Sequence, residues 1–337
     1  MHPMNQKNSI RQGLNLMKKK TYIYLLALVP FLIVAMLYEI VPLITVIVKS
    51  FQPDGGTGFT LENYQSVFSK LLYQKAIINS IKISLTSAVA GIIIAFLGAR
   101  AAHQHQGKLN HVFMTVLNMV SNFAGIPLAF AYMILLGNAG LVVNIGKELG
   151  INALSTYNLY TMNGMSLIYI YFQIPLSTLL LIPAFDGVQK QWKEACTLLG
   201  GTPGIFWRKV GIPVLMPSIL GTFSVLFANA LAAYATIYAL MMDNIALLPV
   251  QIAGCFTGEV KIRAGLGGAL SVVMMAIMVI MILITNGLRS AFTDTTGDVN
   301  YPVQMAAVAL VSAPLFLVFV FLRKYIMTGV SRSGIKG

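Results

Sequence analysis

Residues 194–213 hold the grouping of residue types best suited to binding another chain. They read EACTLLGGTPGIFWRKVGIP and lie between two long apolar segments. We expect a short helix over 189–199, stopped at Gly200 and Gly201 because glycine adopts the backbone angles of a sharp helix end. Thr202-Pro203 would then begin a second helix, as an N-cap followed by proline, and that helix would end at Pro213. The interaction that these residue types allow is ion pairing with a partner chain.

Glu194 carries that chemistry in this stretch. A carboxylate in the first turns of the first helix suits its positive end and is able to pair with a basic side chain of a partner. Trp192 and Lys193 also fit a second interpretation, an amphipathic helix that lies on the membrane surface with no partner. Under both interpretations, this segment lies outside the hydrocarbon core of the membrane.

No residue set in the chain predicts catalysis or a bound cofactor. The nearest approach to a nucleotide-binding G-x-x-x-x-G-K-[ST] loop runs from Gly140 to Gly146-Lys147-Glu148. It has one residue too many between its glycines and Glu in the Ser/Thr position, so it lacks the Mg²⁺ ligand. His103, His105 and His111 do not have the spacing of a metal site. We therefore predict no catalytic residue, no metal and no cofactor, and ATP hydrolysis would need another chain.

The composition indicates a membrane protein. Of 337 residues, 57% are apolar and 10% charged, and the mean hydropathy is +0.78, whereas soluble domains carry about 25% charged residues. The net charge of +13 comes from basic residues gathered in loops and at the ends of apolar segments. They indicate membrane topology and contact with anionic lipid rather than nucleic-acid binding.

The apolar segments predict an all-α, polytopic fold, because a chain in lipid must satisfy its backbone internally. An apolar run of about 20 residues crosses the hydrocarbon core. The predicted spans are 22–48, 76–99, 111–136, 160–184, 218–241, 266–288 and 302–322.

Basic residues predict the topology of these spans. The N-terminus and the loops near 100–108 and 186–217 would be cytoplasmic, and 53–75, 138–159 and 242–263 would lie outside. The run 22–48 is too long for a signal peptide and has no A-x-A-like cleavage site after it, so we expect it to be a signal anchor. A seventh crossing at 302–322 would place the basic tail outside, against the same rule.

Polar and aromatic residues on the spans are candidates to line a solute path, because polar groups in membranes need partners or water. Interhelical hydrogen bonding and packing is the alternative role for each. Glu39, near the outer end of the first span, either lines the path or reaches the interface. The candidates are Glu39, Asn122, Tyr132, Tyr171, Gln173, Asn229, Tyr234 and Tyr238.

The spacing in 194–213 resembles the EAA loop of the membrane subunits of binding-protein-dependent ABC importers. That pattern is E-A-A, three residues, G, nine residues, then I-x-L-P. The present chain departs from it with Cys196, Val210 and Ile212. The resemblance implies a type I importer fold of six core helices and a cytoplasmic loop that couples to ATPases. The coupling residues it implies are Glu194, Ala195, Cys196, Gly200, Val210, Ile212 and Pro213.

Two branches of that family share the resemblance. Residues 206–240, 247–260 and 264–275 resemble permeases of polyamine, opine and phosphonate importers, a likeness that extends over about 1–292. Residues 301–337 resemble the end of maltose-type sugar permeases, whose tail faces the ATPases. A natural fusion, an engineered chimera and a coincidence of apolar sequence remain alternatives.

These resemblances imply a domain order and a set of partners. Residues 1–21 would be a cytoplasmic basic segment, 22–292 the permease domain and 293–337 an appended helix and tail. The partners would be two ATPase subunits, a second permease subunit in a hetero- or homodimer, an extracytoplasmic solute-binding protein and membrane lipid, in a bacterial inner membrane. A polyamine-like or phosphonate-like solute is implied first and a sugar second. An ion-gradient-driven carrier is the rival, which would favour paired intramembrane carboxylates.

Overall fold

The computed structural model describes residues 29–30, 33–34, 36–56, 58–104, 107–242, 244–257 and 262–293. Contacts divide the chain into two units, Val48–Asp298 and a second made of Met1–Ile47 with Val299–Gly337. In the second unit the description covers η1 (Met36–Ile40) and most of α2 (Val41–Ser50). The predicted span 302–322 and the tail lie outside the described residues, so the structure does not test the predictions made for them.

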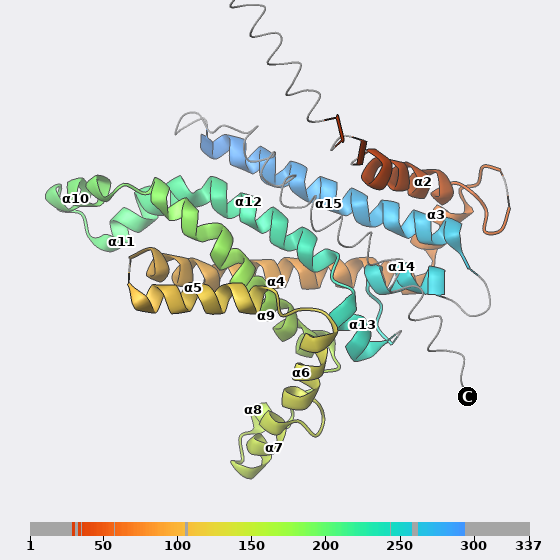
Figure 1. Cartoon of the computed structure of the whole chain (residues 1–337), viewed down its shortest axis with the longest axis horizontal. Helices are drawn as coiled ribbons and strands as arrows, with labels where there is room; N and C mark the ends of the chain where they lie inside the picture. The colour runs from red at the N-terminus through yellow and green to blue at the C-terminus, as the bar shows by residue number, and fades with distance from the viewer. Residues whose placement is uncertain are drawn as a thin grey trace, which may run out of the picture. The chain divides into compact units, whose positions relative to one another are not determined.

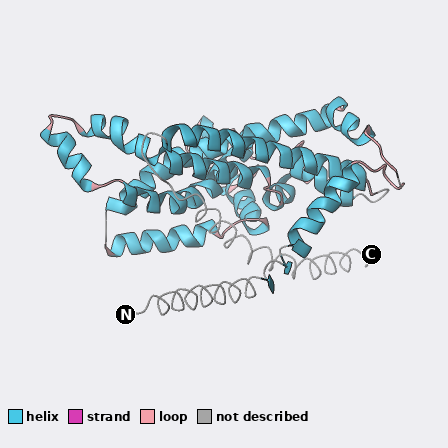
Figure 2. Cartoon of the chain, turned by 90° about the horizontal axis from the view of Figure 1, so that it is seen from above, coloured by secondary structure: helices cyan, strands magenta, loops and turns pink. Residues whose placement is uncertain are grey.

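The described residues are helices and their connections, without a strand (Figure 2), which confirms the all-α prediction. Val48–Asp298 begins with the end of α2 and contains a series of helices drawn in Figure 1. They are α3 (Glu62–Ser69), α4 (Leu71–Gln104), α5 (Lys108–Ser121), α6 (Ile126–Leu136), α7 (Leu141–Glu148), α8 (Asn152–Ser155), α9 (Met162–Leu181), η2 (Ile182–Gly187), α10 (Lys190–Leu198), α11 (Pro203–Phe206), η3 (Trp207–Gly211), α12 (Ile212–Leu231), α13 (Ala235–Met241), α14 (Leu248–Thr257) and α15 (Ala264–Thr293).

Five helical stretches among the described residues are long and apolar enough to cross a membrane. They are Leu71–Gln104, Ile126–Glu148, Met162–Gly187, Pro203–Met241 and Ala264–Ser290. At 34 residues, α4 is about 50 Å long, longer than the roughly 30 Å hydrocarbon core. Its ends therefore extend beyond the apolar thickness.

α4 packs on α9 along a face of small residues. Ser87, Gly91, Ala95 and Ala99, spaced by four, are all buried. A Cβ added at Gly91 would lie 2.8 Å from Cβ of Gln173. Small residues let two helix backbones approach closely in lipid, where packing replaces the hydrophobic effect as the source of helix association.

Hydrogen bonds join α15 to the rest of Val48–Asp298 at two positions along the helix. In its last third, the hydroxyls of Ser224 on α12 and Thr285 on α15 are 2.5 Å apart. At its start, Asp54 Oδ1 accepts hydrogen bonds from the backbone N–H groups of Gly265 (2.7 Å) and Leu266 (3.4 Å). A carboxylate there caps the positive end of α15, so the loop after α2 is fastened to the start of the last described helix.

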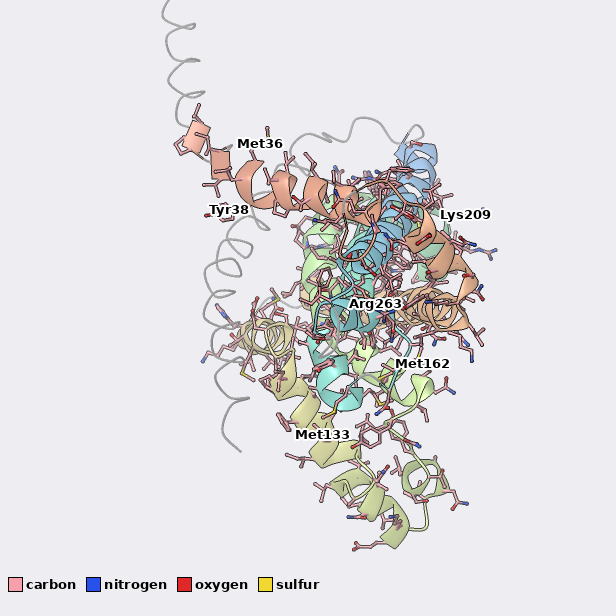
Figure 3. All side chains as sticks on the ribbon, turned by 90° about the vertical axis from the view of Figure 1, so that its right-hand side faces the viewer. Met36, Tyr38, Met133, Met162, Lys209 and Arg263 are labelled. Atoms are coloured by element: carbon pink, nitrogen blue, oxygen red, sulfur yellow. The ribbon has the colours of Figure 1, made fainter. Side chains whose placement is uncertain are left out.

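Two predicted spans are not single helices. The predicted helix over 111–136 is broken between α5 and α6, and the one over 218–241 between α12 and α13. Gly125, with a φ of 72°, lies in the first break, a conformation that glycine adopts readily. Beyond it, α6, α7 and α8 form a limb that extends away from α4 and α12 (Figure 1), with Met133 of α6 labelled in Figure 3.

Candidate functional site

The exposed segment between η2 and α12 corresponds to the EAA-like stretch, and we call α10, residues 199–202 and α11 the arm. No residue of α10 is buried. Leu198 and Leu199 are 88% and 89% exposed, and Trp192 is 37% exposed. Figure 1 shows the arm at one end of Val48–Asp298, with α3 and α14 at the other, which we call the distal end. The arm thus offers apolar side chains that nothing in Val48–Asp298 covers.

The arm helix stops in a Schellman motif. Gly200 has a φ of 80°, its N–H donates to Thr197 O (3.0 Å), and the Gly201 N–H donates to Cys196 O (2.8 Å). These two bonds satisfy carbonyls that the end of the helix would leave free. A Cβ added at Gly201 would lie 2.5 Å from Sγ of Cys196. The turn therefore needs a glycine at 200 for conformation and one at 201 for space.

The chain restarts as predicted at Thr202. Its side chain accepts from the N–H of Ile205 (3.4 Å), and proline follows in the first turn. The prediction that this second helix ends at Pro213 is wrong. A π-helical turn, η3, carries α11 directly into α12, with the Ile212 N–H donating to Trp207 O. Proline has no N–H to donate, and the extra residue of a π-turn allows the helix to continue through it.

Three aromatic rings fix the base of the arm. Phe185 precedes the arm, Trp207 follows it, and Phe96 lies on α4. The ring centroids are 5.3 Å apart for Phe96 and Phe185, 5.9 Å for Phe96 and Trp207, and 6.1 Å for Phe185 and Trp207. Packed aromatic pairs are worth about 0.5–1.5 kcal/mol each beyond area burial. Both stems of the arm are thereby attached to the same end of α4.

Two basic side chains of α4 complete this base. The Arg100 guanidinium lies 4.4 Å from the centre of the Trp207 ring, a cation–π contact. His103 Nδ1 is 3.4 Å from Asp186 Oδ1. Arg100 belongs to one loop predicted to be cytoplasmic and Trp207 to the other, so the structure places both loops at one end.

The predicted coupling residues divide by exposure. Glu194 and Ala195 are exposed and Cys196 is half-buried at the turn. Glu194 is the fifth residue of α10, beyond the first turn, so the expectation that it stabilises the helix's positive end is wrong, because that effect fades within one turn. Its carboxylate is exposed and available to a partner. Val210 and Pro213 are half-buried, and Ile212 is 37% exposed.

Two of the predicted path residues meet in the bundle. Gln173 of α9 is fully buried, its Nε2 donates to Leu226 O of α12 (2.6 Å) and its Oε1 accepts from Nδ2 of Asn229 (3.3 Å). Asn229 is exposed. Gln173 therefore joins α9 to α12, and only its partner Asn229 presents a polar group outward.

The predicted tyrosines form two pairs. Tyr132 on α6 and Tyr171 on α9 meet edge to face, with centroids 5.6 Å apart. Tyr234 and Tyr238 stack at 5.0 Å, as their four-residue spacing predicts. Tyr238 is 38% exposed. Ring faces of this kind bind either sugars or cations.

The two helix breaks lie side by side. Thr236 Oγ1, at the start of α13, donates to Gly125 O (3.1 Å), before α6. Asn122 is the C-cap of α5 and Tyr234 the N-cap of α13, so two predicted path residues flank these breaks. Irregular backbone at membrane depth occurs where it is buried in protein or lines a water-filled cavity. Glu39, in η1, is exposed.

One functional candidate was missed from the sequence. Lys82 is exposed in the interior of α4, and an ionisable residue within a span marks a functional site more often than not. The signal was present, since Lys75, Asn79, Lys82 and Thr86 follow a spacing of four, three and four, which keeps them on one helix face. Among the described residues, no group of three or more His, Cys, Asp or Glu could hold a metal ion.

Comparison with known proteins gives the fold a context. No family model matches the chain. It is 25% identical to the trehalose transport system permease protein SugB of Mycobacterium tuberculosis over 273 residues, 78% of this chain and 93% of that protein. It is 22% identical to the spermidine/putrescine transport system permease protein PotC of Haemophilus influenzae over 260 residues, 76% of this chain and 95% of that protein.

Solved structures agree with these relatives. A chain of a bacterial ABC transporter involved in import of the acidic polysaccharide alginate matches with a TM-score of 0.66 and 16% identity, over 83% of this chain and 99% of that one. A chain of a bacterial alginate ABC transporter in complex with an alginate pentasaccharide-bound periplasmic protein matches with a TM-score of 0.65 and 15% identity, over 80% of this chain and 94% of that one. The chain therefore has the fold of an ABC importer transmembrane domain and resembles the permease subunits of such importers.

Proposed function

We propose that this chain is the permease subunit of an ATP-driven importer, in which the arm engages an ATPase and the broken spans form part of the solute path. The observation that carries the proposal is the arm itself. Its first helix, α10, ends at two leucines that are almost fully exposed, and the arm stands on an aromatic base shared with α4. An apolar surface of this kind beyond the spans marks a protein contact.

The proposed mechanism follows from how the arm is connected. A partner that holds Leu198 and Leu199 would move α10, and the Schellman turn passes that movement to α11. Because α11, η3 and α12 are continuous, the movement reaches α12 without a flexible joint. α12 ends at the break beside Tyr234, where a change in helix position alters the neighbouring path. The chain's own part is thus mechanical, and hydrolysis belongs to the ATPase chains.

The proposed assembly has the partner kinds of an ABC importer. Two ATPases would bind the arms of two permease subunits, alike or different, and a solute-binding protein would deliver solute at the distal end. The arm and the N-terminus would then be cytoplasmic, in a bacterial inner membrane with basic residues near anionic lipid. The division at 1–21, 22–292 and 293–337 belongs to this proposal.

The solute is not given by resemblance alone. One similar relative is named for trehalose and another for spermidine and putrescine, in keeping with the two branches, sugar and polyamine, that the sequence resembles. Phosphonate-like solutes belong to the second branch. The proposed path residues are Glu39, Asn122, Tyr132, Tyr171, Gln173, Asn229, Tyr234 and Tyr238, with Gln173 acting through Asn229.

Co-purification tests the arm. We expect the full chain, expressed with its native partners and purified in mild detergent, to bring down a nucleotide-hydrolysing chain. The double variant Leu198→Ser, Leu199→Ser should reduce the amount recovered at least tenfold, because the apolar contact surface is lost. The matched control is Leu149→Ser, Ile151→Ser, which removes two exposed apolar side chains (66% and 42%) from the limb.

The co-purification experiment has one outcome that supports the proposal and two that contradict it. Loss of the ATPase from the arm variant, with retention in the limb variant, supports the proposal. Full recovery of the ATPase with the arm variant, or no ATPase with the unmodified chain, would overturn it.

A further inference from the structure

The exposed face of α4 changes character along the helix. Its distal half carries four polar side chains, next to the exposed Ile78 and Leu85, and its other half carries apolar ones. The four polar side chains and three of the apolar ones follow the same three- and four-residue spacing, so they lie on one face. The polar members are Lys75, Asn79, Lys82 and Thr86, and the apolar ones are Val89, Ile93 and Leu97.

This face is not the one that holds the bundle together. The opposite face of α4, with Ser87, Gly91 and Ala95, packs against α9. On the polar face, Asn79 Nδ2 donates to Ala246 O (3.1 Å) and Thr86 Oγ1 donates to Lys82 O (2.9 Å). Asn79 and Thr86 thus have hydrogen-bond partners within the protein. The ammonium groups of Lys75 and Lys82 are the polar groups of this face that remain available to a ligand.

Neither lysine is neutralised within the part of the chain that the structure describes. The ion pair found there is His103 with Asp186, far along α4 from Lys82. α4, α9, α12, α13 and α15 contain no Asp or Glu at all. Lys82 lies 11 residues, about 16 Å, from the start of α4, inside the predicted span 76–99. A charge at that depth faces water or an opposite charge.

We propose that Lys75 and Lys82 line the distal part of the solute path and attract a solute that carries an anionic group, a carboxylate, phosphonate, phosphate or sulfate. The inference rests on the proposed function, because it takes α4 to border the path. The ammonium groups are about 10 Å apart along the axis and donate hydrogen bonds to oxyanions. A solute anion passes from one to the next, whereas a polyamine is repelled by the same face.

Charge-selective labelling tests the inference on the whole transporter in membranes. Thr86→Cys is treated with two methanethiosulfonates of similar size, one bearing a sulfonate and one a trimethylammonium group. Mass spectrometry of the peptide that contains residue 86 gives each rate without removal of Cys196 or Cys255. Phe59→Cys, at an exposed distal loop position, gives the rate ratio away from the lysines.

We expect the anion-to-cation rate ratio at Thr86→Cys to exceed that at Phe59→Cys about tenfold at low salt, because a charge about 6 Å away changes each rate about threefold in opposite directions. Adding Lys82→Gln should remove that excess, and Lys82→Arg should keep it.

Two results would overturn the inference. No modification of Thr86→Cys by either reagent would mean that the face is covered or lies in lipid, and a ratio unchanged by Lys82→Gln would mean that the lysine does not act on the path. A failure of the proposed function would be seen in the co-purification experiment, as the absence of a co-purifying ATPase. The labelling and co-purification experiments therefore distinguish a failure of this inference from a failure of the proposed function.

Discussion

At the scale of single residues, the arm depends on two adjacent glycines with different tasks. Gly200 adopts a positive φ, which costs most other residues about 1–2 kcal/mol. Gly201 has an ordinary backbone but leaves no room for a Cβ against Cys196. By the same contact, a side chain larger than cysteine at position 196 would push into Gly201.

Gly200→Ala should loosen the end of the arm helix, whereas Gly200→Asn should not, because asparagine tolerates the left-handed conformation. We expect the Gly201 N–H, which donates to Cys196 O, to exchange with solvent at least fivefold faster in Gly200→Ala, the equivalent of about 1 kcal/mol. Hydrogen exchange read by mass spectrometry on residues 190–206 measures this. Equal exchange in the two variants would contradict the role given to the turn.

At the scale of elements, the pairing of α4 with α9 depends on how closely two backbones approach. Gly91 and Gly98 lie on the same helix, two turns apart, yet their surroundings differ. A Cβ at Gly91 would meet Gln173 Cβ at 2.8 Å, whereas one at Gly98 would make its nearest contact at 3.7 Å, with Thr178. The helix contact is therefore tight at one glycine and has ordinary clearance at the other.

Gly91→Ala should destabilise the protein by about 1–3 kcal/mol, the usual cost of overpacking, and Gly98→Ala should be neutral or slightly stabilising because alanine favours the helix. The midpoint of thermal aggregation in detergent, followed by size-exclusion chromatography, should fall by several degrees for the first variant only. A fall of equal size for both would show that helix propensity, and not the close approach, governs this interface.

Elements marked by strong local signals were predictable from the sequence. The arm helix was expected over 189–199 and spans Lys190–Leu198, because glycines end it and the N-cap at Thr202 begins its successor. The break at Gly125 had the same kind of signal, a glycine two residues before Pro127, yet the long apolar run hid it. The break at 232–234 has no comparable signal, since Ala232 and Ala233 favour helix, and tertiary contacts decide it.

Of the candidate site, residue types were predictable but their partners were not. Gln173 and Asn229 are 56 residues apart and meet only because α9 packs on α12. The aromatic base of the arm joins Phe96, Phe185 and Trp207 from three separate elements, and no local pattern predicts such a meeting.

At the scale of the whole molecule, the proposed ATPase contact lies at one end of Val48–Asp298 and the proposed lysine face lies in the distal half, and α4 and α12 connect them through the base of the arm. Phe185 is 2% exposed and contacts both Phe96 and Trp207. α4 runs from that base to the polar face that carries Lys82, and α12 runs from it to the helix breaks. We therefore expect a movement of the arm to be transmitted to the distal half through two helices, α4 and α12, both of which contact the aromatic base of the arm.

Phe185→Leu should uncouple the distal half from the ATPases without detaching them, because leucine keeps much of the buried volume but loses the ring contacts. In the unmodified background, trapping the ATPases with ATP and vanadate should change the labelling rate of Thr86→Cys by the sulfonate reagent at least threefold. That change should disappear with Phe185→Leu and persist with Phe227→Leu, a matched loss of a buried ring on α12 (1% exposed). Co-purification shows whether the ATPases remain bound, and a nucleotide-dependent change that survives Phe185→Leu would mean that the rings hold the fold together but do not carry the movement.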